Sequence, residues 1–260
     1  MPGPTASAST TRSSWRSFAS HLMRDPLAMI GLILVVIIVG SAILAPLLVP
    51  HDPNKINVRY RLKGPSAEHW IGTDQIGRDV LSRIIMGSRI ALQVALFSIS
   101  IAASCGLVLG MLAGYGPRWL DSALVVLFDT VRSFPTIMFA LAVVTLVGPS
   151  LNTVILVVIV TSIPVYGRIV RTQTQALRNN EFIMAERAMG AGTLRVLGVH
   201  ILPNVIGPLL IIASMDIPVV VTIEAGLSFL GLGVRPPTAS WGTVLNDGYA
   251  FIRNTPWLVI

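Results

Sequence analysis

Residues 27–49 read LAMIGLILVVIIVGSAILAPLLV and contain no charged side chain. A helix rises 1.5 Å per residue, so about 20 apolar residues cross the roughly 30 Å hydrocarbon core of a bilayer. The uncharged stretch around this run, from Pro26 to Pro50, is longer than the roughly 7–15 apolar residues of a cleavable signal peptide. We therefore expect a membrane-spanning helix here.

The composition extends this expectation to the whole chain. Of its 260 residues, 53% are hydrophobic and 12% are charged, and the mean hydropathy is +0.75. An average soluble domain has about 25% charged residues. The net charge of +7 does not indicate nucleic-acid binding, because the basic residues are not gathered on a polar domain with interleaved aromatic residues. The single cysteine, Cys105, lies in an apolar run and supplies neither a disulfide framework nor a metal-ligand spacing.

Four further spans follow from the apolar stretches. They are expected within Ile90–Gly116, from near Ser122 to the Gly148 break, from about Thr153 to about Ile169, and from after Pro203 to about Leu232. The third includes Asp129 and Arg132, which are three residues apart on one helical face and are expected to pair. The chain closes on Trp257-Leu-Val-Ile260, which is how a further span would begin. The sequence thus predicts an all-α polytopic helical membrane protein with five visible spans and a sixth beyond the C-terminus.

The polar regions divide the chain. Residues 1–25 form a basic tail, and residues 26–260 form the transmembrane domain, with polar loops at 51–89 and 170–203. Basic residues are nearly equal in number on the two sides, so the positive-inside rule leaves the orientation open. In the second half of the first loop, Ile76 to Ile85 form an amphipathic pattern that Thr73 or Asp74 is expected to cap. Such a helix would lie on the membrane surface or pack on another part of the assembly.

The loop at 170–203 is patterned rather than featureless. Phe182, Ala185 and Met189 recur at helical spacing, and Gly190-Ala-Gly192 breaks that helix. Thr193 is expected to cap a second short helix, Leu194 to Ile201, and Pro203 suits the first turn of the fifth span. The sequence predicts a helix-turn-helix that protrudes from the membrane.

Three segments carry a family resemblance. Ala185-Glu-Arg-Ala-Met-Gly-Ala191, followed at fixed spacing by His200-Ile-Leu-Pro-Asn204, resembles the coupling-loop signature of ABC importer permeases. Residues 72–83 (GTDQIGRDVLSR) and 224–242 (EAGLSFLGLGVRPPTASWG) resemble the dipeptide/oligopeptide/nickel branch, in particular its DppC/OppC-type subunit. The chain departs from the signature at Met184, where the signature has Glu, at Glu186, where it has Ala, and at His200, where it has Ile.

The resemblance implies a type I ABC importer permease fold in the bacterial cytoplasmic membrane, surrounded by lipid. It places residues 1–25 and the 170–203 loop in the cytoplasm and the 51–89 loop outside. It implies as partners a second permease subunit of the DppB/OppB type, two ATP-binding subunits and an extracytoplasmic substrate-binding protein. The chain has no phosphate-binding loop of the GxxxxGK[ST] kind. It is therefore expected to be no enzyme and to hold no cofactor, with ATP and Mg bound by the partner subunits.

The resemblance also assigns contacts to the coupling loop. In the family this loop enters a cleft of the ATP-binding subunit, whose closure on ATP drives alternating access. Apolar anchors such as Met189 and Leu197 would supply burial, Glu186 and Arg187 orientation, and Gly190 the sharp bend. The residues expected to couple the chain to the ATPase are Glu181, Ala185, Glu186, Arg187, Gly190, Leu197, Leu202 and Pro203.

Two acids in the fifth span are candidates for the translocation path. Asp216 and Glu224 lie eight residues apart and can face one side of the helix, with Pro218 between them. An acid within a membrane is costly unless it faces water or a partner group. Two roles are open for these acids. They could line a substrate path and meet a peptide's amino group, or they could bond to neighbouring helices or lie near the membrane edges.

The function predicted from these observations is ATP-driven import of peptides, with dipeptides as the expected cargo and nickel or longer peptides as alternatives. A stand-alone secondary transporter would be expected to show internal repeats or paired broken helices, and the sequence shows neither. A structural membrane protein would leave the coupling-loop pattern unexplained. No metal site is expected.

Overall fold

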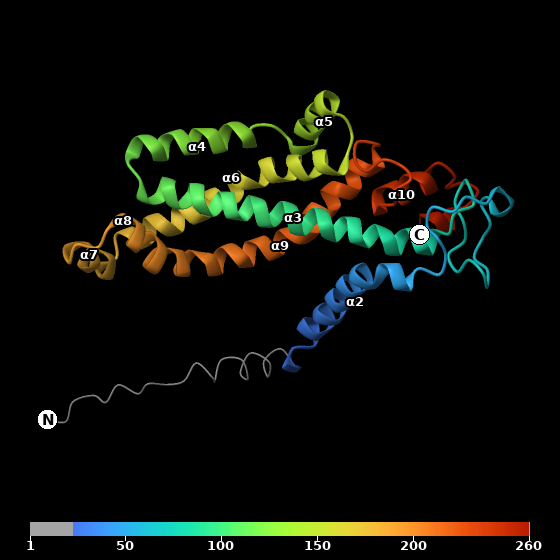
Figure 1. Cartoon of the computed structure of the whole chain (residues 1–260), viewed down its shortest axis with the longest axis horizontal. Helices are drawn as coiled ribbons and strands as arrows, with labels where there is room; N and C mark the ends of the chain where they lie inside the picture. The colour runs from blue at the N-terminus through green and yellow to red at the C-terminus, as the bar shows by residue number, and fades with distance from the viewer. Residues whose placement is uncertain (1–22, 260) are drawn as a thin grey trace.

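The computed structural model describes residues 23–259, and within this range the chain is helical with connecting loops and no named strand (Figure 1). The predicted all-α class is confirmed. Most of the expected basic tail, residues 1–22, lies outside the described residues. The helices are α2 (Pro26–Leu48), α3 (Val80–Tyr115), α4 (Arg118–Arg132), α5 (Thr136–Val147), α6 (Leu151–Arg178), α7 (Glu181–Ala188), α8 (Thr193–Arg195), α9 (Leu202–Phe229) and α10 (Trp241–Tyr249). A π-helical segment, η2 (Val196–Ile201), joins α8 to α9, and two short 3₁₀ turns are η1 (Val58–Tyr60) and η3 (Pro256–Leu258).

Among the described residues, four helices are long and apolar enough to cross a membrane: α2, α3, α6 and the continuous helix from Thr193 to Phe229. The pair α4 and α5 passes the same test only as a bent unit, with an angle of 84° between its two parts. Five spans are thus obtained as predicted, but the third is broken rather than straight. Pro135 caps α5, and a residue that precedes proline is disfavoured in the α conformation, so the helix is interrupted at this point.

The expected pair of Asp129 with Arg132 is wrong. Asp129 forms its ion pair with Arg168 of α6. One turn further along α6, Arg171 pairs with Asp121 near the start of α4. The charges of the broken span therefore fasten α4 to α6 rather than neutralising each other within one helix.

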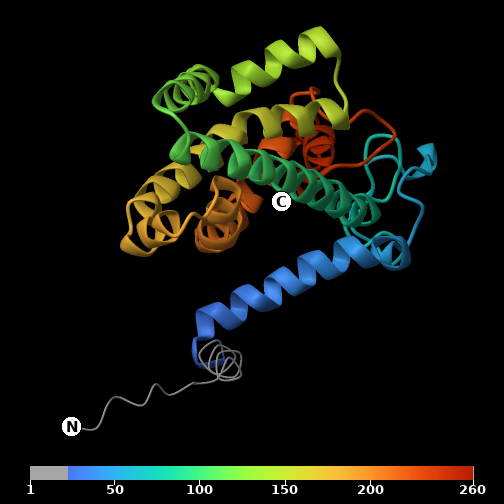
Figure 2. The ribbon, with the colours of Figure 1, turned by 60° about the vertical axis from the view of Figure 1, so that its left-hand side comes forward.

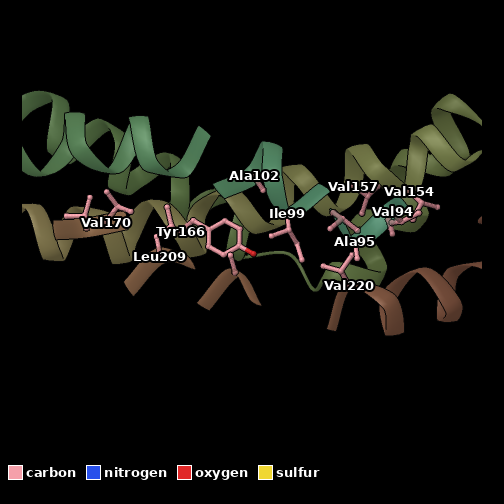
Figure 3. Packing of buried hydrophobic residues seen from close by; sticks show 14 of the residues in the cluster. Val94, Ala95, Ile99, Ala102, Val154, Val157, Tyr166, Val170, Leu209 and Val220 are labelled. Carbon is pink, nitrogen blue, oxygen red and sulfur yellow. The ribbon is translucent and has the colours of Figure 1, made fainter. Parts of the chain in front are cut away.

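The core lies between α3, α6 and α9 (Figures 2 and 3). In the close-up, Ile99 and Ala102 of α3 face Tyr166 of α6, and Leu209 of α9 lies on the other side of that ring. Glycines bring α3 and α6 especially close, because a Cβ atom on Gly106, Gly110 or Gly114 would lie within 2.6 Å of atoms of α6. Small residues at such spacing allow membrane helices to approach closely.

The amphipathic helix expected over residues 76–85 is the first part of α3, and it begins later than predicted. Asp79, and neither Thr73 nor Asp74, is the N-cap, since its carboxylate accepts a hydrogen bond from the Ser82 amide at 2.8 Å. From Val80 the helix runs without interruption through the second span, so residues 80–89 of the predicted 51–89 loop belong to α3. Its apolar face packs on α10 and η3 of the same chain, through contacts with Val244 and Leu258.

The loop at 170–203 is also shorter than predicted. Helix α6 continues to Arg178, so only residues 179–201 project beyond the bundle. The helix expected from Leu194 to Ile201 is present as α8 and η2, but it continues into α9 without a break, and its N-cap is Gly192 rather than the Thr193 side chain. Pro203 does lie in the first turn of α9.

Helix α2 stands apart from the bundle. Its most apolar stretch is only 6% buried, and its two buried residues, Ala42 and Ala45, both lie in its last two turns. Figures 1 and 2 show this helix approaching α3 at one end and diverging from it at the other. It therefore presents nearly its whole length to lipid or to another subunit.

Candidate functional site: the projecting segment, the α9 acids and the opposite end

Residues 179–201, called the projecting segment below, form one end of the molecule, opposite to α10 and the loop 49–79 (Figure 1). Helix α7 ends in a turn at Gly190, whose φ of +88° lies in the left-handed region that favours glycine. The Ala191 amide donates to the Glu186 carbonyl at 3.0 Å, and the Gly190 amide donates to the Arg187 carbonyl at 3.0 Å. This is the Schellman pattern, and it reverses the chain in two residues.

Apolar side chains lie on both faces of the projecting segment: one set is buried against the core, and the other is exposed. Ile183, Val196 and Ile201 are buried and join the main core. By contrast, Met189 is 75% exposed and Leu194 is 85% exposed. Two large apolar side chains on neighbouring turns at the tip of a protein are a pattern typical of contact with a partner.

The predicted coupling residues occupy different places. Glu181, Ala185, Arg187, Gly190 and Pro203 are exposed, while Glu186, Leu197 and Leu202 are half-buried.

Two of the charged residues contact other parts of the chain. Glu186 lies 3.5 Å from His200, measured from Oε1 to Nε2, and the Arg187 guanidinium lies 5.7 Å from the centre of the Tyr115 ring at the end of α3. Leu197 packs against the core and is not an outward anchor, a role that its exposed neighbour Leu194 fits instead. Leu194 was not among the predicted anchors, although it lies one helical turn before Leu197.

The two acids of α9 have unlike surroundings. Glu224 is fully buried and accepts a hydrogen bond of 2.7 Å from the Ser228 hydroxyl, whose oxygen also accepts from the Val234 amide. Asp216 is half-buried on the same helix. Only Asp216 therefore remains partly accessible in this conformation.

At the opposite end, the segment 72–83 forms a buried ion network with α10. The Arg78 guanidinium donates to Asp74 at 2.6 Å and to Asp247 at 3.0 Å, and Arg83 lies 3.5 Å from Asp247. The Trp241 indole donates to the Ile84 carbonyl at 3.0 Å. The segment 224–242, which also carries the family resemblance, therefore contacts the start of α3 beside this ion network. These two segments, which are far apart in the sequence, build one structural unit.

A cleft of about 600 Å³ opens between the end of α2 and the first half of α3. Its walls are mostly apolar, with Ala42 and Phe97 on opposite sides, and Arg89 and Gln93 contribute exposed polar groups. The sequence did not predict this cleft, because it depends on how α2 is placed.

The comparisons with known proteins agree with this geometry. Residues 106–260 match the family described as "Binding-protein-dependent transport system inner membrane component". The chain belongs to this family. Residues 13–65 also match the "N-terminal TM domain of oligopeptide transport permease C". This family member is accordingly an inner-membrane protein.

Several curated relatives cover almost the whole chain. The chain is 40% identical over 251 residues to the dipeptide transport system permease protein DppC of Alkalihalophilus pseudofirmus, which spans 96% of this chain and 83% of that protein. It is 36% identical to the glutathione transport system permease protein GsiD of Pectobacterium atrosepticum, over 96% of this chain and 84% of that one. It is also 36% identical to the di/tripeptide permease DppC of Pseudomonas aeruginosa, over 94% and 82%.

Solved structures show the same fold at lower identity. The MetNI methionine ABC transporter in an inward-facing conformation matches with a TM-score of 0.56 and 21% identity, over 69% of this chain and 84% of that chain. An amino acid ABC transporter crystallised with histidines matches with a TM-score of 0.52 and 14% identity, over 69% and 81%. The predicted permease fold is confirmed.

Proposed function

We propose that the chain is a membrane-spanning subunit of an ATP-driven peptide importer and that dipeptides are its cargo. The observation that carries this proposal is the 40% identity to a dipeptide permease over 96% of the chain. The proposed assembly contains a second permease of the DppB/OppB type, two ATP-binding subunits that hold ATP and Mg, and an external substrate-binding protein. Secondary transport is disfavoured by membership of a binding-protein-dependent family.

The projecting segment is proposed to couple ATP hydrolysis to transport from the cytoplasmic side. Met189 and Leu194 would enter a cleft of the ATP-binding subunit, because burying them there removes apolar surface from water. The charged side chains of Glu181 and Arg187 would orient the contact, and the turn at Gly190 would present it. The exposed Ala185 and Pro203 would contribute to the same contact, and the half-buried Glu186, Leu197 and Leu202 would support the segment from the side that faces the core.

A charge placed at the tip tests this role. Met189→Asp would bury an unpaired carboxylate, and anchor residues at interfaces contribute about 2 kcal/mol or more, so binding of the ATP-binding subunits should weaken by at least about thirtyfold. Ala176→Asp, at an exposed position near the end of α6, is the matched control and should bind normally. The measurement is co-purification of the ATP-binding subunits together with peptide-stimulated ATP hydrolysis. Normal stimulation in Met189→Asp would remove the proposed role.

Asp216 is proposed to contribute to the translocation path by attracting the amino group of a peptide, whereas Glu224, buried beside Ser228, would act there only after a rearrangement. Uptake of a free dipeptide should fall in Asp216→Asn, while uptake of its N-acetylated form should be unchanged relative to the unmodified transporter. A variant that assembles and still discriminates between the two peptides as the unmodified transporter does would exclude this contact.

Cargo is tested by uptake in cells that lack this chain and are then supplied with it. Labelled dipeptide, longer peptide, glutathione and Ni²⁺ are offered separately. Dipeptide uptake restored ahead of the others is the expected result, and restoration of Ni²⁺ uptake alone would replace the peptide proposal with a nickel one.

A further inference from the structure

Three side chains from separate parts of the loop 49–79 converge on one point. His51 follows the end of α2, His69 lies in the middle of the loop, and Asp79 is the N-cap of α3. Their ligand atoms all lie within 4.8 Å of one another. Nδ1 of His69 is 2.8 Å from Oδ1 of Asp79, and Nδ1 of His51 is 3.8 Å from the same oxygen.

This His51–His69–Asp79 cluster is sheltered. The Asp79 side chain is 1% exposed and that of His69 is 10% exposed, while His51 is 36% exposed and borders solvent. Nδ1 of His51 is nevertheless buried and has no hydrogen-bond partner among residues 23–259. A buried nitrogen without a partner is costly, and the carboxylate toward which it points is a possible co-ligand.

Asp79 is suited to hold a cation, because Oδ1 of its buried carboxylate lies near the ring nitrogens of both histidines.

We propose that the His51–His69–Asp79 cluster binds a divalent transition-metal ion, with Zn²⁺ as its natural probe. Two imidazoles and one carboxylate are ligands that zinc accepts, whereas Ca²⁺ and Mg²⁺ prefer oxygen alone. With metal–ligand bonds of about 2.0–2.1 Å, tetrahedral donors lie about 3.3 Å apart. Two of the three separations, 2.8 and 3.8 Å, lie on either side of this distance, and all three lie within 4.8 Å, so a shift of the partly exposed His51 side chain would bring the ligand atoms together. The ion would take the place of the proton between His69 and Asp79, and the fourth position would hold water.

The groups around the cluster support the ligands as metal sites require. The Ser82 hydroxyl donates to Oδ2 of Asp79 at 2.6 Å, and the Ser82 amide donates to the same oxygen at 2.8 Å, which leaves Oδ1 for the ion. The His51 amide donates to the Ser82 hydroxyl oxygen at 3.1 Å. The Tyr60 ring meets the His69 ring edge to face, with centroids 5.3 Å apart. A bound ion would therefore fix the end of α2 to the start of α3.

The test uses the assembled transporter after removal of metals with a chelator. Co²⁺ replaces Zn²⁺ as a spectroscopic probe, because its visible absorption reports tetrahedral nitrogen and oxygen ligands, and Zn²⁺ affinity is measured by calorimetry. The decisive variant is His51→Gln, since the His51 side chain makes no hydrogen bond whose loss would disturb the fold. His200→Gln, the same exchange in the projecting segment, is the matched control.

The unmodified transporter and His200→Gln should bind one more Co²⁺ or Zn²⁺ per copy of this chain than His51→Gln binds. Loss of groups behind the ligands alone weakens metal sites about 10–100-fold, so His51→Gln should bind at least about tenfold more weakly. Zn²⁺ should also raise the melting temperature of the first two proteins and not that of His51→Gln. Equal Zn²⁺ binding by His51→Gln, or no binding by the unmodified transporter beyond that of its partners, would show that the cluster is only a hydrogen-bonded pair with a neighbouring histidine.

Discussion

The close approach of α3 to α6 gives the sharpest prediction for stability. A Cβ atom added to Gly110 would lie 2.5 Å from the Gly167 carbonyl oxygen and 2.7 Å from Cβ of Val170. Ordinary contact begins at 3.4 Å, so the helices would have to separate by the difference, about 0.9 Å. Neither neighbour can move aside alone, because one is backbone and the other is the branch point of a stiff side chain.

The expected cost follows from two opposing effects. Overpacking of a tight core costs about 1–3 kcal/mol, whereas exchanging glycine for alanine within a helix gains about 0.5–1 kcal/mol. Gly110→Ala should therefore lower the free energy of unfolding by about 1–2 kcal/mol. Gly226→Ala on α9 is the matched control, because no atom of the described residues lies within 4 Å of its added Cβ, and it should gain the helical term alone.

The assay is thermal unfolding of the transporter in detergent, with the three proteins compared under identical conditions. The melting temperatures should rise in the order Gly110→Ala, unmodified chain, Gly226→Ala. Gly110→Ala melting at or above Gly226→Ala would refute the reasoning, since it would mean that α3 and α6 are not held in this close contact.

Two further substitutions test other parts of the fold. Asp247→Asn leaves Arg78 short of a charged partner and should lower the free energy of unfolding by about 2 kcal/mol, less than the 3–5 of a fully buried pair because Asp247 is 23% exposed; Glu68→Gln, at an exposed position, should leave the melting temperature unchanged. Gly190→Ala forces a left-handed φ on alanine at a cost of about 1–2 kcal/mol, so peptide-stimulated ATP hydrolysis should fall while the melting temperature of the transporter stays the same. Gly192→Ala, whose φ is ordinary, should change neither the hydrolysis rate nor the melting temperature. Unaltered hydrolysis in Gly190→Ala would show that the turn does not matter for coupling.

Most of the membrane-spanning architecture was predictable because long apolar runs have few alternatives in a bilayer. Residues 27–49 were placed to within one residue of α2, and the end of the second span at Gly116 was correct. The ion pair of the third span could not be predicted correctly, because the partner of Asp129 is Arg168, far along the chain. Local spacing offered Arg132 instead, and only the packing of α4 on α6 decides between them.

The same division holds for the candidate site. The position of the projecting segment and its bend at Gly190 followed from short-range signals, namely helical spacing and a glycine-rich break. The orientation of Leu197 and Leu194 did not, because it depends on the π-helical turns of η2, which rotate the side chains relative to an ordinary helix. The His51–His69–Asp79 cluster was missed for a different reason: its members share no helical or ligand spacing, and the folded loop alone brings them together.

Helix α2 has a mechanical consequence. It is about 35 Å long at 1.5 Å per residue, and its buried residues are confined to its last two turns, next to the hydrogen bond that the His51 amide donates to the Ser82 hydroxyl oxygen. A rod held at one end amplifies rotation: a tilt of about 10° at the anchor moves the other end by about 6 Å over that length. A small tilt of α2 at the junction between His51 and Ser82 would therefore displace the other end of this helix, across the full thickness of the bilayer.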